Sequence, residues 1–261
     1  MPPGPRDIVE VFGVAARRYV HLIGGGGKTT LMFALARALA DSGRTVLTTT
    51  TTRIREPDPE QSERVITASD TEALITRLKA ELAVRRHVTA AASRDAAGRK
   101  LGGFDPDQLD RIVEAAIADH VIVEADGSAG LSLKAHREHE PVVSARADLV
   151  IAVVGVDVLG APLDDAHVHR ADLARARLGR PAPAPVTAED VAGIVFHRDG
   201  YLARVAPGAA VIAFVNKADT PARLAEARRL AAALRAADRA RRVDRVVVGD
   251  ARNALFEIVP R

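Results

Sequence analysis

The sequence contains no cysteine and no tryptophan, and aromatic residues make up only 3% of its 261 positions. Without cysteine the chain can form neither a disulfide bond nor a thiolate metal site, which favours the reducing environment of the cytoplasm. Aromatic platforms on which bases could stack are scarce, and 37 basic residues against 34 acidic ones leave a formal net charge of only +3. We therefore expect no nucleic-acid partner.

Long apolar runs are absent as well. The longest, residues 149–156, is far too short to span a bilayer, and the first six residues lack the apolar core of a signal peptide. We expect a cytoplasmic protein with no membrane partner. With 48% apolar residues the chain can bury one sizeable core, which predicts a single domain over residues 1–261. Nothing in the pattern indicates an oligomeric state.

Short apolar runs alternate along the chain with helical patterns. The opening is a strand at residues 19–23, a helix at 31–40 and a second strand at 45–48. Further strands are expected at 64–67, 87–91, 120–123, 149–154, 210–215 and 245–248, and further helices at 71–85, 106–118 and 221–237. A long charged loop is expected around 127–146. This alternation predicts an α/β fold with a mostly parallel sheet and helices on both faces.

A glycine-rich segment stands between the first strand and the first helix: Gly24, Gly25, Gly26, Gly27, Lys28, Thr29 and Thr30. Four glycines allow a tight turn with inward N–H groups, and the helix N-terminus adds partial positive charge, so a phosphate group fits there. Lys28 would reach the β- and γ-phosphates, and the Thr29 hydroxyl would bind Mg²⁺. The usual pattern begins with a glycine where this chain has Leu22. The segment predicts a P-loop NTPase that binds GTP or ATP with Mg²⁺.

Acidic residues follow the strand expected at 120–123. Glu124 stands where P-loop proteins carry the carboxylate that orders Mg²⁺ and its waters. The run Glu124-Ala-Asp126-Gly127 also imitates an Asp-x-x-Gly pattern in which the glycine N–H meets the γ-phosphate. Either Glu124 or Asp126 is then the acid on the metal side. The threonines at 48–52, at the end of the second strand, are a further candidate for ligand contact.

A possible base-reading motif follows the strand expected at 210–215. It consists of Asn216, Lys217, Ala218 and Asp219. In GTP-binding proteins such an Asn-Lys-x-Asp motif lets the Asp carboxylate accept both guanine N–H groups, while the Lys stem lies along the base and the Asn ties loops together. Adenine cannot donate that pair of hydrogen bonds. The motif favours GTP over ATP, and residues 248–251 would form a second loop near the base.

Together these motifs resemble those of the YqeC family, accessory proteins of selenium-dependent molybdenum hydroxylases. The resemblance rests on residues 24–30, 124–127, 134–141, 168–170 and 216–219, and on the threonine-rich strand end. It implies a nucleotide-dependent role in preparing or inserting the selenium-containing molybdenum cofactor. A molybdenum hydroxylase or its cofactor-maturation proteins would be the partner. The motif order is also similar to that of metallochaperone GTPases, whose thiolate metal sites the absence of cysteine excludes here.

Polar residues in two of these segments are candidate substrate contacts: Lys134, His136, His139, His169 and Arg170. Imidazole and carboxylate groups could hold a divalent metal, or bind an oxyanion beside the neighbouring cations. A charged surface loop is favoured over a metal site. Contact with a substrate or with the γ-phosphate stays an open alternative.

Three functions are compatible with these motifs. A GTPase that couples hydrolysis to cofactor maturation is favoured by the Asn-Lys-x-Asp motif. An ATP-dependent kinase or transferase would use residues 134–141 as the acceptor site for a small molecule. A nucleotide-responsive scaffold would bind nucleotide without turnover.

Overall fold

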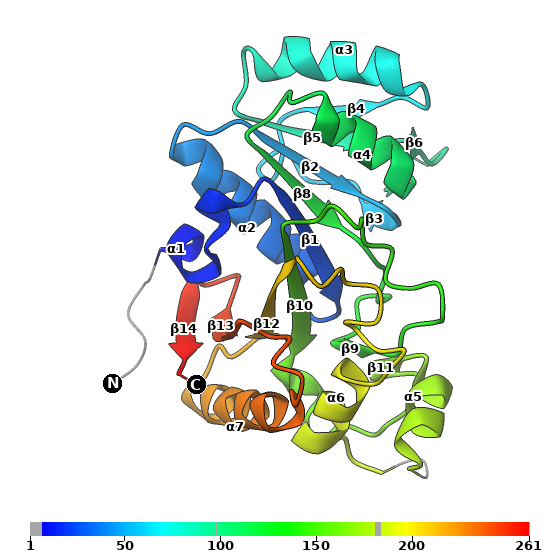
Figure 1. Cartoon of the computed structure of the whole chain (residues 1–261), viewed down its shortest axis with the longest axis vertical. Helices are drawn as coiled ribbons and strands as arrows, with labels where there is room; N and C mark the ends of the chain where they lie inside the picture. The colour runs from blue at the N-terminus through cyan, green and yellow to red at the C-terminus, as the bar shows by residue number, and fades with distance from the viewer. Residues whose placement is uncertain (1–6, 98, 181–183, 261) are drawn as a thin grey trace.

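The computed structural model describes residues 7–97, 99–180 and 184–260 and is built around a nine-stranded sheet (Figure 1). Its strands are β1 (Tyr19–Gly24), β2 (Val46–Thr50), β4 (Val65–Thr67), β5 (His87–Ala91), β8 (His120–Glu124), β10 (Leu149–Gly155), β12 (Ala210–Asn216), β13 (Arg245–Asp250) and β14 (Leu255–Val259). The spatial order is β14-β13-β12-β10-β1-β8-β2-β5-β4. Neighbouring strands run parallel except β14, which is antiparallel to β13. The expected α/β fold with a mostly parallel sheet is confirmed.

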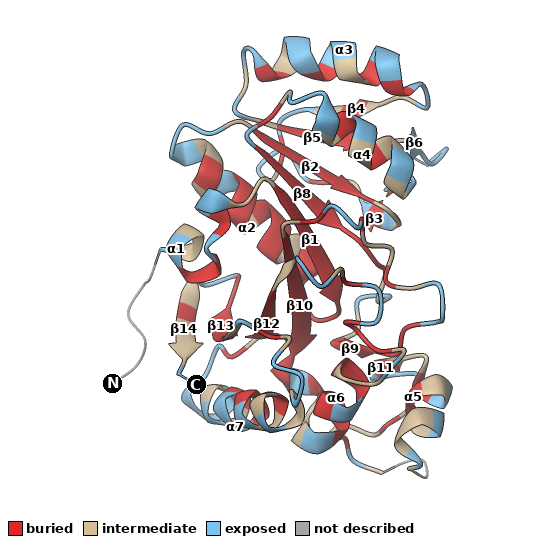
Figure 2. Cartoon of the chain, in the orientation of Figure 1, coloured by how far each residue is buried: buried red, intermediate tan, exposed pale blue. Residues whose placement is uncertain are grey.

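Helices flank this sheet on both faces: α1 (Ile8–Phe12), α2 (Lys28–Asp41), α3 (Thr71–Leu82), α4 (Pro106–Glu114), α5 (Ala171–Leu178), α6 (Ala188–Val195) and α7 (Pro221–Ala237). Apolar residues of α1 and α2 form one buried cluster with the sheet, and those of the other helices form a second. Along β1, Leu22 belongs to the first cluster and Ile23 to the second, because alternate side chains point to opposite faces. The central strands β1, β8 and β10 are therefore buried along their whole length (Figure 2).

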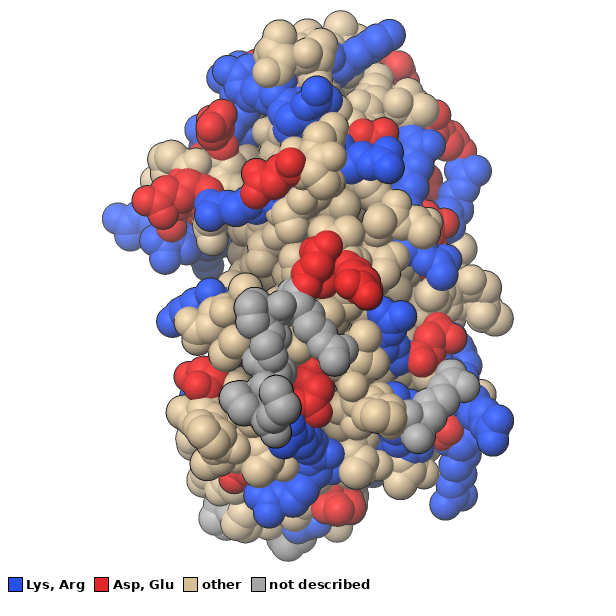
Figure 3. Space-filling view, turned by 90° about the vertical axis from the view of Figure 1, so that its left-hand side faces the viewer, with Lys and Arg blue, Asp and Glu red and all other residues tan. Residues whose placement is uncertain are grey.

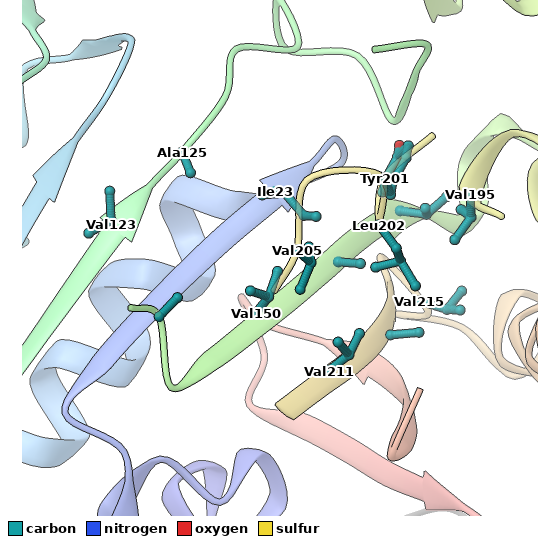
Figure 4. Packing of buried hydrophobic residues seen from close by; sticks show 14 of the residues in the cluster. Ile23, Val123, Ala125, Val150, Val195, Tyr201, Leu202, Val205, Val211 and Val215 are labelled. Carbon is teal, nitrogen blue, oxygen red and sulfur yellow. The ribbon is translucent and has the colours of Figure 1, made fainter. Parts of the chain in front are cut away.

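The second cluster reaches the carboxyl end of β1, as Figure 4 shows. Ile23, Val150 and Val215 come from three strands of the sheet, and Tyr201 and Leu202 pack with them from the segment after α6. The Tyr201 ring lies against the end of β1 so closely that a Cβ at Gly24 would meet it at 2.3 Å. The core is thus continuous with the region where the glycine-rich segment begins.

Local sequence signals explain where several helices begin and end. Asp105 and Gln108 form a capping box at the start of α4, and Thr220 caps α7. Helix α7 covers the expected residues, whereas α4 ends at Glu114 instead of 118. The earlier end follows from Ala116, which has a φ of 54°, a left-handed conformation that no helix continues through.

Several short elements lie outside the predicted pattern. Strands β3 (Arg53–Arg55), β6 (Ser93–Arg94) and β7 (Lys100–Gly102) form an antiparallel sheet, and β9 (Leu133–Lys134) pairs in parallel with β11 (Val168–His169). Strand β9 is the regular element within the charged segment 127–146. Short 3₁₀ turns at Val14–Ala16 and Val156–Val158 complete the elements. Helices α1, α5 and α6 and strand β14 were also not predicted, although Thr187 and Asp190 form a capping box at the start of α6.

The surface mixes charges of both signs. On the face drawn in Figure 3, Lys and Arg side chains are interspersed with Asp and Glu side chains and do not gather into one large patch. Within the described ranges, no helix has both the length and the apolarity needed to cross a bilayer.

Candidate functional site

The glycine-rich segment and the acidic residues meet at one edge of the sheet. Strand β1 ends at Gly24 and the neighbouring parallel strand β8 ends at Glu124, with Leu22 paired to Glu124 in the register. Parallel strands place their carboxyl ends at the same edge, which is where open α/β sheets bind ligands. Helix α2 then begins at Lys28, so its first turn faces the same region.

Thr29 and Glu124 are in direct contact. The Thr29 hydroxyl donates to Glu124 Oε2 at 2.6 Å, and Lys28 Nζ lies 3.9 Å from Glu124 Oε1. Burial raises the pKa of the Glu124 carboxyl, against the opposing effects of Lys28 and of the Thr29 hydrogen bond. The two residues predicted to face a metal ion therefore present their oxygens side by side at the start of α2.

Asp126 is the centre of a buried charge cluster. Its carboxylate accepts from the Gly24 N–H at 2.9 and 3.1 Å and from His136 Nε2 at 2.6 Å. The ammonium groups of Lys28 and Lys134 lie 3.1 and 3.4 Å away. Burial alone would raise the pKa of Asp126, but Lys28 and the His136 hydrogen bond outweigh it and hold that pKa well below its usual range. Asp126 is therefore an ionised counter-ion whose oxygens are already engaged.

The distribution of partners separates the two acids that the sequence left as alternatives. Asp126 is saturated by two ammonium groups, an imidazole and a backbone amide. Glu124 has one hydroxyl partner and a distant ammonium. Glu124 is consequently the acid better able to take a metal ion, whereas Asp126 holds Lys28 and the start of the glycine segment in place.

The glycine segment, residues 24–27, is enclosed by neighbouring backbone. The Gly25 N–H donates to the Val153 carbonyl at 2.9 Å, and the Gly26 N–H donates to the Leu131 carbonyl at 3.0 Å. A Cβ at Gly26 would lie 2.3 Å from the backbone nitrogen of Gly155, so only glycine fits this close approach. The amides of the first turn of α2, by contrast, have no acceptor within the helix, as at any helix N-terminus.

Lys28 folds back over this segment. Its Nζ donates to the Gly24 carbonyl at 2.5 Å while pairing with Asp126, and the side chain is buried. A lysine held at the N-terminus of a helix beside free amides provides positive charge from two sources at one point. The arrangement can hold an anion there.

Lys134 joins the Asp126 cluster to a second group of charges. Its Nζ donates to the Gly127 carbonyl at 2.7 Å and lies 3.6 Å from Glu140 Oε1. Arg170 binds both oxygens of Glu140, with Nη2 2.9 Å from Oε1. Burial would raise the pKa of Glu140, but the Arg170 hydrogen bond and its other partners lower it to about 2. Lys134, His136 and Arg170 are thus brought together as a structural network beneath the glycine segment.

The other two candidate substrate residues lie apart from Asp126. His139 is exposed and lines a pocket with Arg177 and His197. His169 is half-buried on β11, beside Lys134 in the strand register, and burial lowers the pKa of its imidazole. The five residues of the predicted substrate set therefore belong to different surroundings.

Among the residues the structure describes, no three His, Asp or Glu side chains are grouped closely enough to hold a metal ion by themselves. Nucleotide-bound Mg²⁺ takes one or two protein oxygens and completes its shell with phosphates and water. The adjacent oxygens of Thr29 and Glu124 suit that requirement.

Asn216 ties three loops together, as the motif predicts for an asparagine at this position. Its Nδ2 donates to the Gly26 carbonyl at 2.7 Å, and its Oδ1 accepts from the Ala251 N–H at 2.9 Å. Lys217 Nζ donates to Ser132 Oγ at 2.6 Å and pairs with Asp157 at 2.8 Å. The loop after β13 is therefore next to the glycine segment, where the sequence suggested a second base loop.

Asp219 lies on the surface at the start of α7. Its Oδ1 accepts from Arg223 Nη1 at 3.0 Å, and 38% of its side chain is exposed. A carboxylate that is this accessible can receive hydrogen bonds from a ligand.

The threonines at 48–52 serve mainly to connect strands. Thr50 Oγ1 donates to the Glu124 carbonyl at 2.8 Å, and Thr48 Oγ1 contacts Thr89 and His87. Thr49 and Thr51 have buried hydroxyls without a hydrogen-bond partner among the described residues. Thr50 therefore helps to hold the backbone of Glu124 in position.

Sequence reasoning missed two residues that enclose the site. Ser132 lies against the glycine segment, and the Tyr201 hydroxyl accepts a hydrogen bond from the Lys134 amide at 3.3 Å. Neither carries a local signal, because their partners are distant in sequence. Glu140, one of the charged residues of the motif at 134–141, binds Arg170.

Comparison with known proteins gives one consistent result. The sequence model of a family described as "YqeC protein" matches residues 20–172. A protein of Escherichia coli (strain K12), described as "Uncharacterized protein YqeC", is 34% identical over 215 residues, which cover 82% of this chain and 81% of that protein.

Proposed function

This chain belongs to the YqeC family, and on that premise we propose that it is a P-loop NTPase. Residues 24–30 hold the phosphates of GTP or ATP, and Lys28 is their main cationic partner. The observation that carries the proposal is the contact of Thr29 with Glu124 at 2.6 Å, beside Lys28 and the N-terminus of α2. A hydroxyl, a carboxylate, a lysine and free helix amides at the carboxyl end of a central strand are the groups that a Mg²⁺-nucleotide requires.

Magnesium is assigned to Thr29 and Glu124. When bound, the ion neutralises charge on the phosphates. The chain's own part is to keep the two oxygens adjacent, and Thr50 helps by binding the Glu124 backbone. Asp126 stays outside the metal shell in this proposal, because its oxygens pair with Lys28, Lys134 and His136.

Phosphate binding would rearrange the backbone that lies against the glycine segment. The amides of Gly25 and Gly26 donate to the Val153 and Leu131 carbonyls. A triphosphate that uses these amides must displace those carbonyls. Ser132 connects this backbone to the base motif, because its hydroxyl accepts from Lys217. We propose that residues 131–132 shift when nucleotide binds.

Guanine is the favoured base. Asp219 is accessible, Lys217 lies beside Ser132 over the glycine segment, and Asn216 joins both loops. These placements support an Asn-Lys-x-Asp role for the three residues. GTP hydrolysis would then serve maturation of a molybdenum hydroxylase or of its cofactor, the role that the family resemblance implies.

An ATP-dependent kinase or transferase is the second candidate. The observation that favours it is a pocket of about 630 Å³ beside residues 137–139, a volume within the usual range for small-molecule sites. Such a pocket could hold an acceptor molecule.

A nucleotide panel tests the proposal. GTP, ATP, GDP and ADP are titrated at equilibrium with and without Mg²⁺, and phosphate release is followed for both triphosphates. We expect Mg²⁺-dependent triphosphate binding with GTP ahead of ATP. Failure of both triphosphates to bind would contradict the proposal, and a clear preference for ATP would move the assignment to the kinase class.

A further inference from the structure

A second polar pocket lies outside the Asp126 cluster. It has a volume of about 630 Å³ and is formed by residues 137–139, helix α5 and residues 197–199. Its lining is Arg137, Glu138, His139, Leu173, Ala176, Arg177, His197, Arg198 and Asp199. Three segments that are distant in sequence thus each contribute an arginine to one cavity.

The positive charges of this pocket are only partly neutralised. Asp199 lies 3.5 Å from Arg198, with which it pairs, and its carboxylate is 3.7 Å from His197 Nδ1. Within the described ranges, no carboxylate lies within 4.0 Å of the Arg137 or Arg177 guanidinium. Two arginines of the pocket therefore form no ion pair, although its lining also contains the Glu138 and Asp199 carboxylates.

Arg177 is the pocket arginine with a buried N–H donor that lacks a partner among the described residues. Its Nη2 donates to the His136 carbonyl at 2.7 Å, while Nη1 is buried with no partner among the described residues. Burial lowers the pKa of its guanidinium, with Asp199 opposing. A partly buried guanidinium without a paired carboxylate is electrostatically unfavourable. An anion in the pocket would relieve that cost.

The imidazole of His197 adds a donor. Its Nδ1 accepts from the Asp199 N–H at 3.1 Å, so the neutral ring carries its proton on Nε2. Burial and the neighbouring Arg177 charge lower the pKa of this imidazole, which favours the neutral ring. Three guanidinium groups and an N–H donor are better suited to an oxyanion than to a cationic or apolar ligand.

We propose that this pocket binds a small phosphorylated organic molecule at a site separate from the nucleotide phosphates. Donors from three segments can surround a tetrahedral phosphate, whereas a planar carboxylate needs only one arginine fork. The volume exceeds that of a bare phosphate, and Leu173 and Ala176 supply apolar wall for the remainder of the molecule. The assignment stands whether or not the chain hydrolyses a nucleotide.

The pocket is connected to the Asp126 cluster through one residue. Arg177 binds the backbone carbonyl of His136, and the ring of the same histidine contacts Asp126 at 2.6 Å. A ligand that binds Arg177 would therefore change a contact of the segment that holds Asp126. This connection would allow occupancy of the pocket to be sensed at the glycine segment.

Titration calorimetry on the full chain tests the site, with ribose 5-phosphate, inorganic phosphate and ribose as probes. We expect ribose 5-phosphate to bind more tightly than inorganic phosphate and ribose not to bind. Arg137→Gln and Arg177→Gln should each weaken ribose 5-phosphate at least about tenfold. Arg229→Gln, on exposed α7, is the matched control and should bind as the wild type does.

Two further arms separate this proposal from the nucleotide site. Lys28→Ala should retain ribose 5-phosphate binding, with only a small change transmitted through His136, while weakening triphosphate binding. Loss of ribose 5-phosphate binding in Lys28→Ala would overturn the proposal, as would wild-type affinity in both pocket variants. Equal affinity for inorganic phosphate and ribose 5-phosphate would also overturn it. Thermal unfolding checks that Arg177→Gln is folded. If Arg177→Gln does not fold, Arg137→Gln still tests the site, because the Arg137 side chain is exposed.

Discussion

The side-chain amide of Asn216 donates to the carbonyl of Gly26 at 2.7 Å, although 190 positions separate the two residues in the chain. The carbonyl of the same side chain accepts from Ala251. One buried asparagine thus fixes the glycine segment after β1 to the ends of β12 and β13. The loop proposed to hold phosphates and the loops proposed to hold the base cannot move independently while these bonds are intact.

Asn216→Ala should therefore impair both binding and stability. It leaves the Gly26 carbonyl and the Ala251 amide buried without their partner, and we expect the free energy of unfolding to fall by about 1–3 kcal/mol. Affinity for GTP and for ATP should fall by similar factors, because the side chain positions loops and does not read the base. Urea unfolding and nucleotide titration measure the two effects. A loss confined to GTP would show that Asn216 contacts guanine.

Lys28→Ala should weaken triphosphate binding at least about tenfold, equivalent to about 1.4 kcal/mol. The substitution removes the buried ammonium proposed to meet the β- and γ-phosphates. Asp126 keeps Lys134, His136 and the Gly24 amide as partners, so the fold should survive. Fluorescent-nucleotide titration, with circular dichroism as the fold control, measures the effect. Unchanged affinity and turnover would remove the glycine segment from its proposed role.

Glu124→Gln and Asp126→Asn should have different consequences, since each keeps the shape of the side chain and deletes its charge. Glu124→Gln should raise the Mg²⁺ concentration needed for nucleotide binding or turnover with little change in stability. Asp126→Asn leaves two buried ammonium groups without their shared counter-ion, which should cost about 3–5 kcal/mol of stability. Magnesium titration and urea unfolding of both variants separate the roles. If Glu124→Gln has wild-type Mg²⁺ dependence, the metal assignment is wrong.

The parallel core could be predicted from the sequence because its strands are buried on both faces. The runs at 149–156 and 210–215 are apolar throughout and are followed by Asp157 and Asn216, so both their type and their position are visible. Strands β9 and β11 are two residues long and have no periodicity that could be detected. Their pairing depends on contacts between distant segments.

The site was predictable in its residue types and not in its connections. The spacing of Lys28, Glu124 and Asp126 relative to apolar strands pointed to one edge of the sheet. No local pattern indicates that Asp126 takes Lys134 and His136 as partners, because this arrangement follows from the path of residues 127–136 across the end of β1. Local sequence patterns likewise cannot separate exposed His139 from buried His136.

His21, in the middle of β1, tests how burial changes the pKa of an imidazole and hence the pH dependence of stability. Both ring nitrogens are buried without a hydrogen-bond partner among the described residues, and burial lowers the pKa of the imidazole from 6.5 to about 3. Between these values the unfolded chain binds a proton that the folded chain does not, so stability falls as pH falls from 6.5 toward 3. The slope from this one group approaches about 1.4 kcal/mol per pH unit.

His21→Leu should remove that contribution. We expect the difference in unfolding free energy between variant and wild type to grow in favour of the variant as pH falls from 6.5 to 4, and to be small at pH 7. His87, whose pKa burial lowers to about 4, is present in both proteins and cancels in the comparison. Urea unfolding at a series of pH values measures the difference. Parallel pH profiles would mean that His21 is not buried neutral in the folded chain.

Asp219 is the residue proposed to decide the identity of the base. If its carboxylate accepts both guanine N–H groups, Asp219→Asn replaces one accepting oxygen with a donating amide that faces a guanine donor. GTP affinity should fall, because losing a charge-assisted hydrogen bond costs on the order of 1.5–3 kcal/mol. Xanthine carries a carbonyl in place of the guanine amino group, so the new amide should find an acceptor there. Xanthosine triphosphate should then bind the variant better than GTP does, reversing the wild-type order.

Arg223→Gln is the matched control, because Asp219→Asn also breaks the 3.0 Å ion pair with Arg223. The control loses that ion pair and keeps the carboxylate, so it should retain the preference for GTP over xanthosine triphosphate. The pair is exposed and should itself contribute at most about 1 kcal/mol to stability. Competition titrations of both variants with GTP, xanthosine triphosphate and ATP measure the three affinities. If the wild type prefers ATP, or if Asp219→Asn keeps its GTP affinity, the carboxylate does not read guanine and the kinase class becomes the better assignment.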